Sequence, residues 1–230
     1  MNWPPIRWVY VAVFAVTCVA LSVTPLVREF TLKNPLPLPL FPTDHPPTAR
    51  EMFILGPDGN KDYTLWYQYG RVVMESHQFD GGLPLYIPDP KIGFPFMYPP
   101  FAALCLAPLT AFGPQVTTVL LVLLNVASFA AAVELSIRAV DPTGRVSPWV
   151  RLLPSALCIF FVYDVFLLGQ PNLGLLALVL GGLALARSGR GWWAGIPLAA
   201  AAAIKAFPVV VLLYLVWRRQ WAAAGSMTLW

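Results

Sequence analysis

The sequence is poor in charge. Only 11% of its 230 residues are charged, whereas 58% are hydrophobic. Soluble domains carry about 25% charged residues, so little of this surface is suited to water. A soluble globular protein is therefore excluded. A transmembrane β-barrel would alternate apolar and polar residues, but runs such as 119–133 and 173–186 contain no charge at all. The composition predicts an all-α, polytopic transmembrane bundle.

Familiar enzyme motifs are also missing. The chain has no Walker loop, GxGxxG, HExxH or GxSxG motif, and no Asp-x-Asp pair. Soluble nucleotide-dependent chemistry is therefore not supported. The three cysteines, Cys18, Cys105 and Cys158, lie in apolar segments without disulfide or zinc spacing. We expect inert buried thiols there, and the sequence predicts neither a metal nor a cofactor.

The charges are unevenly distributed. The segment 28–97 holds eight of the 11 acids but only six of the 15 Lys and Arg. The other bases gather mostly in short connectors and at helix ends, around 138–151, 187–190 and 218–219. This pattern marks cytoplasmic loops and lacks the continuous basic face of a nucleic-acid-binding protein. The acidic segment is then predicted to lie outside the cell.

The chain divides into three predicted regions. A first transmembrane helix lies within 1–27, with its apolar core at 8–24. An extracytoplasmic loop, 28–100, contains an amphipathic interfacial helix over 62–79, whose aromatic residues favour the headgroup level. A helical bundle, incomplete at its C-terminus, follows over 101–230. Its apolar segments are 101–112, 116–137, 150–168, 173–186 and 192–217, and the first of them is short for a full span.

The segment 192–217 is interrupted by Lys205 and Pro208. A single span would place Arg218 and Arg219 outside, whereas two short helices meeting at 205–208 would keep both inside. The positive-inside bias favours the two-helix interpretation, and the single span stays open. The last residues, 221–230, resemble the start of another span. We expect a chain that is part of a longer protein, with a re-entrant end as the alternative.

Polar residues within the apolar segments are the candidate site. A central Asp or Lys costs about 2.5–3.5 kcal/mol on insertion scales, so such residues are functional hypotheses. The polar residues within the apolar segments are Asp164, Gln170, Asn172 and Lys205. The predicted topology brings all four to the outer leaflet, on the same side as Asp62 and Tyr98. The convergence of acids, a base and amides predicts a site for a charged, amphiphilic ligand.

Structural explanations also exist for each of these residues. Asn172 could cap the helix that follows it, and Asp62 could cap its own helix. Tyr98-Pro99-Pro100 could mark a helix start, because proline suits the first turn. Asp164 and Lys205 could form an ion pair within the bundle. These alternatives stay open at the level of sequence.

Six short motifs follow one another over residues 62–221. They are Asp62-Tyr63 with Tyr67, Gly82-Leu83-Pro84-Leu85-Tyr86, Phe96-Met97-Tyr98-Pro99-Pro100, Gly169-Gln170-Pro171-Asn172, Lys205 with Pro208, and Arg218-Arg219-Gln220-Trp221. In this order they resemble glycosyltransferase family 87, a group of GT-C membrane enzymes that includes polyprenol-phosphate-mannose-dependent mannosyltransferases. Each motif is weak alone, and the order makes the set specific.

The resemblance implies inverting transfer of a hexose, with mannose the first candidate, from a polyprenyl-phosphate-sugar donor to a lipid-linked or glycan acceptor. The site would face outward from a bacterial plasma membrane, with no metal. Asp62 would be the catalytic base, and Lys205 suits the donor phosphate as a compact charge. The candidates for sugar or acceptor binding are Tyr63, Trp66, Tyr98, Asp164, Gln170 and Asn172.

Two other classes of function stay open. A transporter or flippase of lipid-linked sugars would use the same outward polar groups without chemistry. It would also need a second polar gate on the cytoplasmic side, and the sequence offers no buried polar groups there. An inactive fragment, or an assembly subunit of such an enzyme, is the other alternative.

Overall fold

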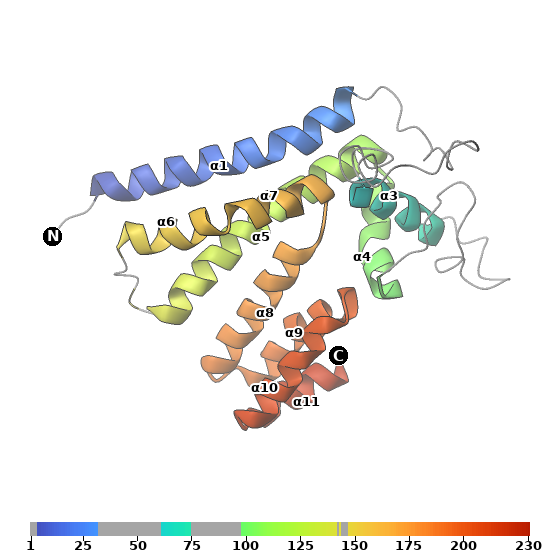
Figure 1. Cartoon of the computed structure of the whole chain (residues 1–230). Helices are drawn as coiled ribbons and strands as arrows, with labels where there is room; N and C mark the ends of the chain where they lie inside the picture. Colours follow the sequence, from blue (N-terminus) through green and yellow to red (C-terminus); the bar gives the residue numbers. More distant parts are fainter. Residues whose placement is uncertain (1–3, 32–60, 75–97, 142, 144–146) are drawn as a thin grey trace, which may run out of the picture. The chain divides into compact units, whose positions relative to one another are not determined.

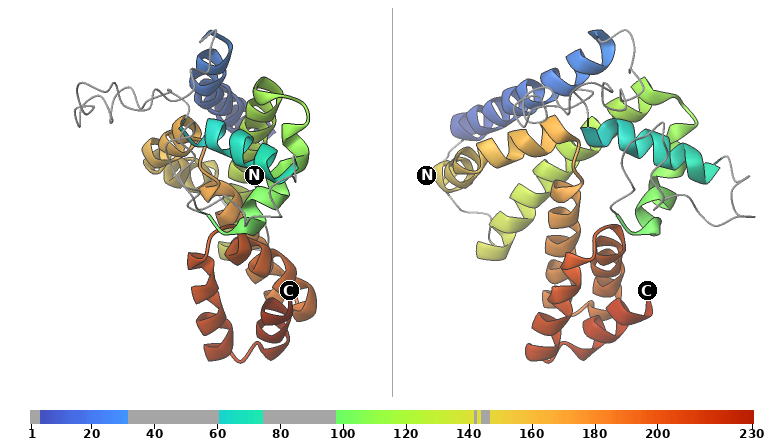
Figure 2. Two further views of the ribbon diagram at one scale, coloured as in Figure 1. Left: turned by 90° about the vertical axis from the view of Figure 1, so that its right-hand side faces the viewer. Right: turned by 45° about the vertical axis from the view of Figure 1, so that its right-hand side comes forward.

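The computed structural model describes residues 4–31, 61–74, 98–141, 143 and 147–230 (Figures 1 and 2). These residues form helices and contain no strand, which confirms the all-α prediction. The chain forms two compact units. The first comprises Met1–Ser22, Leu124–Val165 and Pro171–Trp230, and the second comprises Val23–Leu123 and Phe166–Gln170. The predictions for 32–60 and 75–97, including the motif at 82–86, lie outside the described residues.

Within the described residues, two helices are long and apolar enough to cross a membrane. They are the Trp8–Val27 part of α1 (Pro4–Thr31) and the whole of α5 (Pro114–Val140). Both coincide with apolar segments predicted from the sequence, and their crossing of a membrane stays a prediction. Within the first unit they pack through Phe14 and Phe129, whose ring centroids lie 5.1 Å apart.

The predicted segment 150–168 forms two consecutive helices, α6 (Pro148–Leu157) and α7 (Ile159–Leu168). The backbone hydrogen bonds continue across Cys158, which donates to Pro154 and accepts from Val162. A sharper change follows, because α7 and α8 (Asn172–Arg187) meet at a bend of 118°. The two could form a third span, by length and composition, if the bent pair crosses the membrane as one element.

The predicted amphipathic helix is α3 (Lys61–Met74), and it packs against α4 (Pro100–Thr110). The predicted end of that helix, 75–79, lies outside the described residues. Proline at the first position of α4 suits a helix start, because the missing N–H has no partner there in any case. Gly70 makes the contact possible, since a Cβ at this position would lie 3.4 Å from the Ala107 backbone and would overlap the Thr110 side chain.

The segment 192–217 has the two-helix arrangement. The helix α9 (Gly191–Ile204) ends before Lys205, which is extended with φ −148° and ψ 126°. A short 3-10 turn, η2 (Phe207–Val210), leads into α10 (Val211–Trp217). The chain reverses direction here, so that α10 returns beside the end from which α9 started (Figures 1 and 2). A single straight span over 192–217 is therefore wrong.

Small residues bring the C-terminal helices together. The last helix, α11 (Trp221–Leu229), packs on α9, which also packs on α8. A Cβ added at Gly195 would lie 2.5 Å from the Met227 backbone nitrogen, and one at Gly182 would lie 2.5 Å from the Leu198 side chain. Apolar helices in a membrane gain little from the hydrophobic effect when they associate, so close van der Waals contact holds them together.

The helix α8 ends in a Schellman motif. The N–H of Gly189 donates to the carbonyl of Ala186, and that of Arg190 donates to the carbonyl of Leu185. The motif places one residue in the left-handed region. Gly189 occupies this position with φ +78°, which costs glycine little.

The helix α10 ends in the same motif with a different residue at the key position. The N–H of Arg219 donates to the carbonyl of Val216, and that of Gln220 donates to the carbonyl of Leu215. Arg219 therefore takes the left-handed position, with φ 55°. A residue with a Cβ costs roughly 1–2 kcal/mol in this conformation. Among the described residues, Arg219 is the one non-glycine residue with positive φ.

Candidate active site

Asp62 lies in the first turn of α3, and its side chain is half-buried. The hydroxyl of Tyr98 donates a hydrogen bond to its Oδ2, with a distance of 3.0 Å between the two oxygens. This bond joins the start of α3 to the residues that precede α4. Because α3 begins at Lys61, Asp62 is within the helix and is not its N-cap. A hydroxyl bound to a carboxylate fixes the orientation of both groups.

Tyr98 remains protonated over the range in which the site would work. Burial raises the pKa of Tyr98 far above its usual value, and the negative charge of Asp62 and the hydrogen bond to it raise the pKa further. The phenol is therefore a hydrogen-bond donor at neutral pH. Its protonation state does not change as the pH moves through the physiological range.

The indole ring of Trp66 packs against the Tyr98 ring. The two ring centroids lie 4.4 Å apart with an interplanar angle of 42°. The indole nitrogen of Trp66 donates to the carbonyl of Gly169 at 3.0 Å. Only 3% of Trp66 is exposed, so its ring faces are covered by the protein. The residue thus connects α3 to the turn that follows α7.

Tyr63 makes a second connection between α3 and the end of α7. Its hydroxyl donates to the carbonyl of Phe166 at 2.9 Å, and only 1% of the residue is exposed. Phe166 lies in the last turn of α7, where the final carbonyls have no partner within the helix. Tyr63 therefore satisfies a helix end while it holds α3 in place.

Gly169 is required for two independent reasons. Its φ is +71°, a conformation that L residues rarely adopt. A Cβ at this position would also lie 2.7 Å from the Tyr63 ring. Glycine thus allows both the chain reversal and the contact with Tyr63. Gln170 follows directly and is half-buried.

Lys205 and Asn172 form a separate polar pair in the first unit. Lys205 Nζ donates to Asn172 Oδ1 at 3.1 Å, and both side chains are half-buried. The ammonium also lies 5.9 Å from the centroid of the Phe207 ring. Asn172 is the first residue of α8. The N-cap position belongs to Pro171, which makes no side-chain capping bond, so the structure does not support capping by Asn172.

Asp164 lies on α7 and is exposed. It makes no ion pair with Lys205, whose ammonium is directed at the Asn172 amide. The alternative of a structural ion pair between Asp164 and Lys205 is therefore not observed.

Six of the eight candidate residues thus fall into two groups. Asp62, Tyr63, Trp66 and Tyr98 lie together in the second unit, and Lys205 and Asn172 form a pair in the first. Convergence of the two groups on one ligand stays a prediction. Sequence reasoning missed the carbonyl partners of Tyr63 and Trp66. Gly169, directly before Gln170, is the sequence signal that could have indicated these contacts. Glycine adopts positive φ readily, and this conformation is typical of a tight turn.

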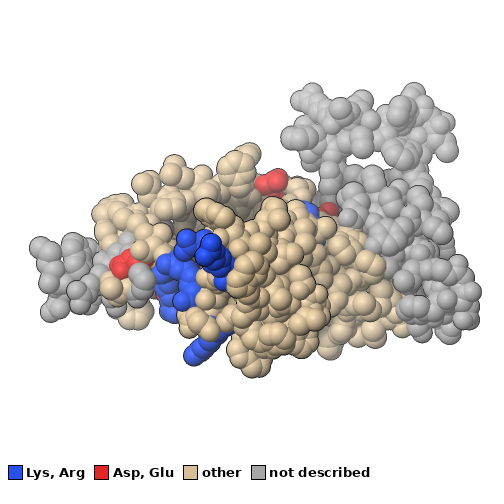
Figure 3. Space-filling model, turned by 90° about the horizontal axis from the view of Figure 1, so that it is seen from below, with Lys and Arg blue, Asp and Glu red and all other residues tan. Residues whose placement is uncertain are grey.

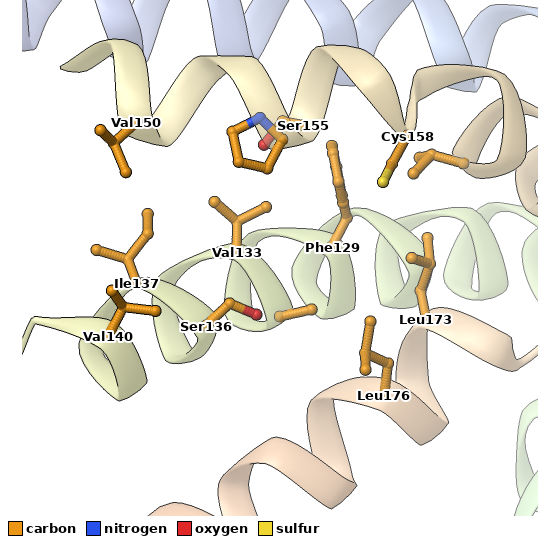
Figure 4. Close-up of a pocket in the computed structure, with 13 residues that line it drawn as sticks. Phe129, Val133, Ser136, Ile137, Val140, Val150, Ser155, Cys158, Leu173 and Leu176 are labelled. Atoms are coloured by element: carbon orange, nitrogen blue, oxygen red, sulfur yellow. The ribbon is translucent and has the colours of Figure 1, made fainter. Parts of the chain in front are cut away.

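The first unit also contains an apolar cavity of about 270 Å³ (Figure 4). Side chains from α5, α6, α7 and the start of α8 line it, together with Cys158 between α6 and α7. They include Phe129, Val133, Ile137, Val150, Leu173 and Leu176. The hydroxyls of Ser136 and Ser155 are the polar side-chain groups in its wall. A lining of this kind suits a hydrocarbon chain. Across the described residues, no three His, Cys, Asp or Glu side chains are grouped to hold a metal ion.

Comparison with known proteins gives one family. A model of the family described as Glycosyltransferase family 87 matches residues 96–230, more than half of the chain. Tyr98, Gln170, Asn172 and Lys205 lie within the match, and Asp62 lies before it. No solved structure matches the chain.

Two curated proteins from Mycobacterium tuberculosis are similar. The chain is 28% identical over 172 residues to the polyprenol-phosphate-mannose-dependent alpha-(1-2)-phosphatidylinositol mannoside mannosyltransferase of strain ATCC 25618 / H37Rv, covering 69% of this chain and 40% of that protein. It is 30% identical over 141 residues to the polyprenol-phosphate-mannose-dependent alpha-(1-2)-phosphatidylinositol pentamannoside mannosyltransferase of strain CDC 1551 / Oshkosh, covering 60% of this chain and 32% of that protein. The chain thus spans less than half the length of both.

Proposed function

The chain belongs to glycosyltransferase family 87, and from this premise we propose that it forms part of a membrane enzyme that uses a polyprenyl-phosphate sugar. The sugar is a hexose, with mannose the first candidate, and the acceptor is a lipid-linked or glycan hydroxyl. The names of the two mycobacterial relatives, both dependent on polyprenol-phosphate-mannose, support this choice. The two long apolar helices suit an enzyme that meets its donor in the bilayer.

The observation that carries the proposal is the carboxylate of Asp62 held by the Tyr98 hydroxyl. In an inverting transfer, the acceptor oxygen attacks the anomeric carbon as the bond from that carbon to the phosphate oxygen breaks. Asp62 takes the proton from the acceptor hydroxyl, and the polyprenyl phosphate leaves with the bonding electrons. A base must lie within hydrogen-bond reach of the proton that it accepts. The proposed role of Tyr98 is to hold the Asp62 carboxylate in such an orientation.

Lys205 is proposed to bind the donor phosphate. A compact ammonium suits a phosphate on which negative charge grows as the bond breaks. The hydrogen bond to Asn172 holds the flexible lysine side chain near one position. The lysine side chain therefore loses less conformational entropy when the donor binds.

The remaining candidates have different proposed roles. Gln170 and Asn172 offer amides for sugar hydroxyls, and exposed Asp164 offers a carboxylate. Tyr63 and Trp66 are buried, so we assign them to positioning Asp62 and Tyr98 rather than to stacking on a sugar. Tyr98 has only 9% of its surface exposed, so its contact with a ligand would be small. The site is proposed to lie on the extracytoplasmic side of a bacterial plasma membrane.

The direct test is sugar transfer by membranes that contain the full-length protein, with radiolabelled polyprenyl-phosphate mannose as donor. Asp62→Asn keeps the size of the side chain but removes the base. It should lower transfer by about 10²–10⁴-fold, the usual contribution of general base catalysis. Asp141→Asn is the matched control, because Asp141 bonds locally to Thr143, and it should transfer at the wild-type rate.

Three outcomes separate the proposals. Loss of transfer in Asp62→Asn alone, with equal membrane insertion of all variants, supports the base. Equal transfer by wild type and Asp62→Asn removes Asp62 from the mechanism. If no protein transfers label but the labelled donor moves across sealed vesicles, the chain acts as a flippase and the transferase proposal is wrong.

A further inference from the structure

The C-terminal part of the chain carries positive charge and contains no acid of its own. Residues 165–230 contain five Lys and Arg and no Asp or Glu. Apart from Lys205, these bases flank two turns. Arg187 and Arg190 flank the turn from α8 to α9, and Arg218 and Arg219 form the turn from α10 to α11. We refer to these four arginines as the basic face.

The two turns lie side by side within the first unit. A Cβ added at Gly191, next to Arg190, would lie 2.9 Å from the Ala222 side chain. The hydroxyl of Ser226 donates to the carbonyl of Trp192. Figures 1 and 2 show both turns at the same end of α8 and α10. In Figure 3, Lys and Arg side chains gather in one area of the surface seen from below. The four charges therefore act on a common region of space.

The basic face is exposed, and no acid among the described residues pairs with it. All four side chains are exposed. Arg187 donates one hydrogen bond, from Nη1 to the carbonyl of Ala139 at 3.1 Å, and a backbone carbonyl carries no full negative charge. In the part of the chain that the structure describes, none of the four makes an ion pair with a carboxylate. Arg138 differs, because Glu134 on the same helix binds it at 2.7 Å.

Four tryptophans surround the basic face. Trp192 and Trp193 follow Arg190, whereas Trp217 and Trp221 enclose the second arginine pair. Their exposed fractions are 51%, 62%, 76% and 63%, respectively. Exposed indoles are costly in water but favourable at the headgroup level of a bilayer. The combination indicates that these turns meet a membrane surface.

The conformation of Arg219 is an independent observation. The ends of α8 and α10 share one hydrogen-bond pattern, and α8 places glycine in the left-handed position while α10 places Arg219 there. A glycine would serve the turn better, so the turn itself does not account for the arginine. Residues held in strained conformations occur often at sites that bind ligands.

We propose that the basic face binds the headgroup phosphate of an anionic glycerophospholipid at the membrane surface. Guanidinium groups present paired N–H donors that match phosphate oxygens. The tryptophans would hold the adjacent glycerol and upper acyl region. This site is distinct from Lys205 and Asn172, and it does not depend on the proposed sugar transfer.

The proposal is tested by the lipids that stay bound to the full chain. The protein is purified from membranes into detergent, and phosphatidylglycerol and phosphatidylcholine are added in equal amounts. Native mass spectrometry then counts each lipid retained. Wild type should retain phosphatidylglycerol in preference. Each arginine replaced by glutamine should weaken this preference about fivefold, the effect of one basic residue at an anionic surface. Arg138→Gln, whose charge is already paired, should leave it unchanged.

Arg219 allows a sharper test. Arg219→Gly removes strain together with the charge, so it should raise the melting temperature in phosphatidylcholine and reduce the preference for phosphatidylglycerol. Arg219→Lys keeps the charge and the strain and should keep most of the preference. Opposite movements of stability and lipid preference in Arg219→Gly separate a binding site from general damage to the fold.

Three results would overturn the proposal. One is equal retention of the two lipids by wild type. Another is an unchanged preference after all four arginines are replaced by glutamine. The third is full competition by soluble glycerol 3-phosphate, which would assign the site to free phosphate compounds. Sugar transfer is measured on the same samples, so failure of the lipid site and failure of the transferase proposal are distinguishable.

Discussion

The residues around α3 and those around α9 solve the same packing problem in opposite ways. At α3, large aromatic side chains reach out to a distant part of the chain, and each ends in a polar group bound to a backbone carbonyl. At α9, glycine and alanine let helices approach until their backbones nearly touch. The first arrangement has direction, because hydrogen bonds fix the angle of α3. The second depends on contact alone.

This difference indicates where accuracy is needed. A catalytic carboxylate must be held within a fraction of an ångström, and Asp62, the proposed base, lies on the helix with directional anchors. The contact between α9 and α11 needs only to be close. Different mutations should therefore destabilise the two regions. Removal of a polar atom should destabilise the packing of α3, whereas an added methyl group should destabilise the packing of α9.

Gly169→Ala should have the largest effect on stability. It combines a left-handed conformation, at roughly 1–2 kcal/mol, with overpacking against Tyr63, at typically about 1–3 kcal/mol. Gly113→Ala is the matched control, because Gly113 also has positive φ, +88°, but no atom within 4 Å of its added Cβ. Thermal unfolding in detergent should show about twice the loss for Gly169→Ala. Equal losses of stability in the two variants would mean that overpacking against Tyr63 adds nothing to the destabilisation by Gly169→Ala.

Gly195→Ala should come next. Its Cβ would overlap Ser226 and the Met227 backbone on α11, and backbone cannot rotate away, so we expect a loss of about 1–3 kcal/mol. Gly225→Ala lies in the partner helix with no neighbour near its added Cβ. It should be neutral or slightly stabilising, because alanine favours helix. Unfolding curves of the two variants, measured side by side, check this. A harmless Gly195→Ala would contradict the close contact of α9 and α11.

Tyr63→Phe tests the directional anchor. It removes the hydroxyl but keeps the ring against Gly169, leaving the Phe166 carbonyl without that donor. We expect a loss of about 1–3 kcal/mol and a fall in sugar transfer, because α3 and Asp62 would be held less firmly. Tyr67→Phe, on the same helix, is the control and should change neither quantity. If both variants transfer sugar normally, Tyr63 is not a positioning residue.

The smallest effect is expected from the pH dependence of Tyr98. Its pKa is raised in the folded protein, so the folded state keeps a proton that the unfolded chain loses near its usual pKa of about 10. The resulting stability is complete below pH about 10 and decreases as the pH rises through the folded pKa. Tyr98→Phe should flatten this decrease relative to wild type, as measured by chemical unfolding at several alkaline pH values. An identical pH slope in the two proteins would contradict the burial of the phenol against Asp62.

Local pattern predicted much of the fold. The apolar runs identified α1 and α5, and aromatic amphipathicity identified α3. The break at Lys205 followed from a charge and a proline in one apolar segment, since each disfavours a continuous buried helix. The division of 150–168 into α6 and α7 was not predicted, because the backbone hydrogen bonds hardly change at Cys158.

The contacts of the candidate site were less accessible from sequence. The residues that matter were identified by type, but their partners lie far along the chain: Tyr63 binds a carbonyl 103 residues away, and Lys205 binds Asn172 at a separation of 33. No local periodicity reports such pairs. The opposite charge of Asp164 suggested it as a partner for Lys205, whereas in the structure Lys205 donates a hydrogen bond to the Asn172 amide.

The break at Lys205 also bears on how the protein enters a membrane. The helix α9 has 14 residues, or about 21 Å at 1.5 Å per residue, against a hydrocarbon layer of about 30 Å. The elements η2 and α10 together are shorter still. Each arm is thus shorter than the hydrocarbon layer, so we expect the two to enter the membrane together as one hairpin. On this expectation, α9 stays in the insertion channel until the ribosome has also made α10.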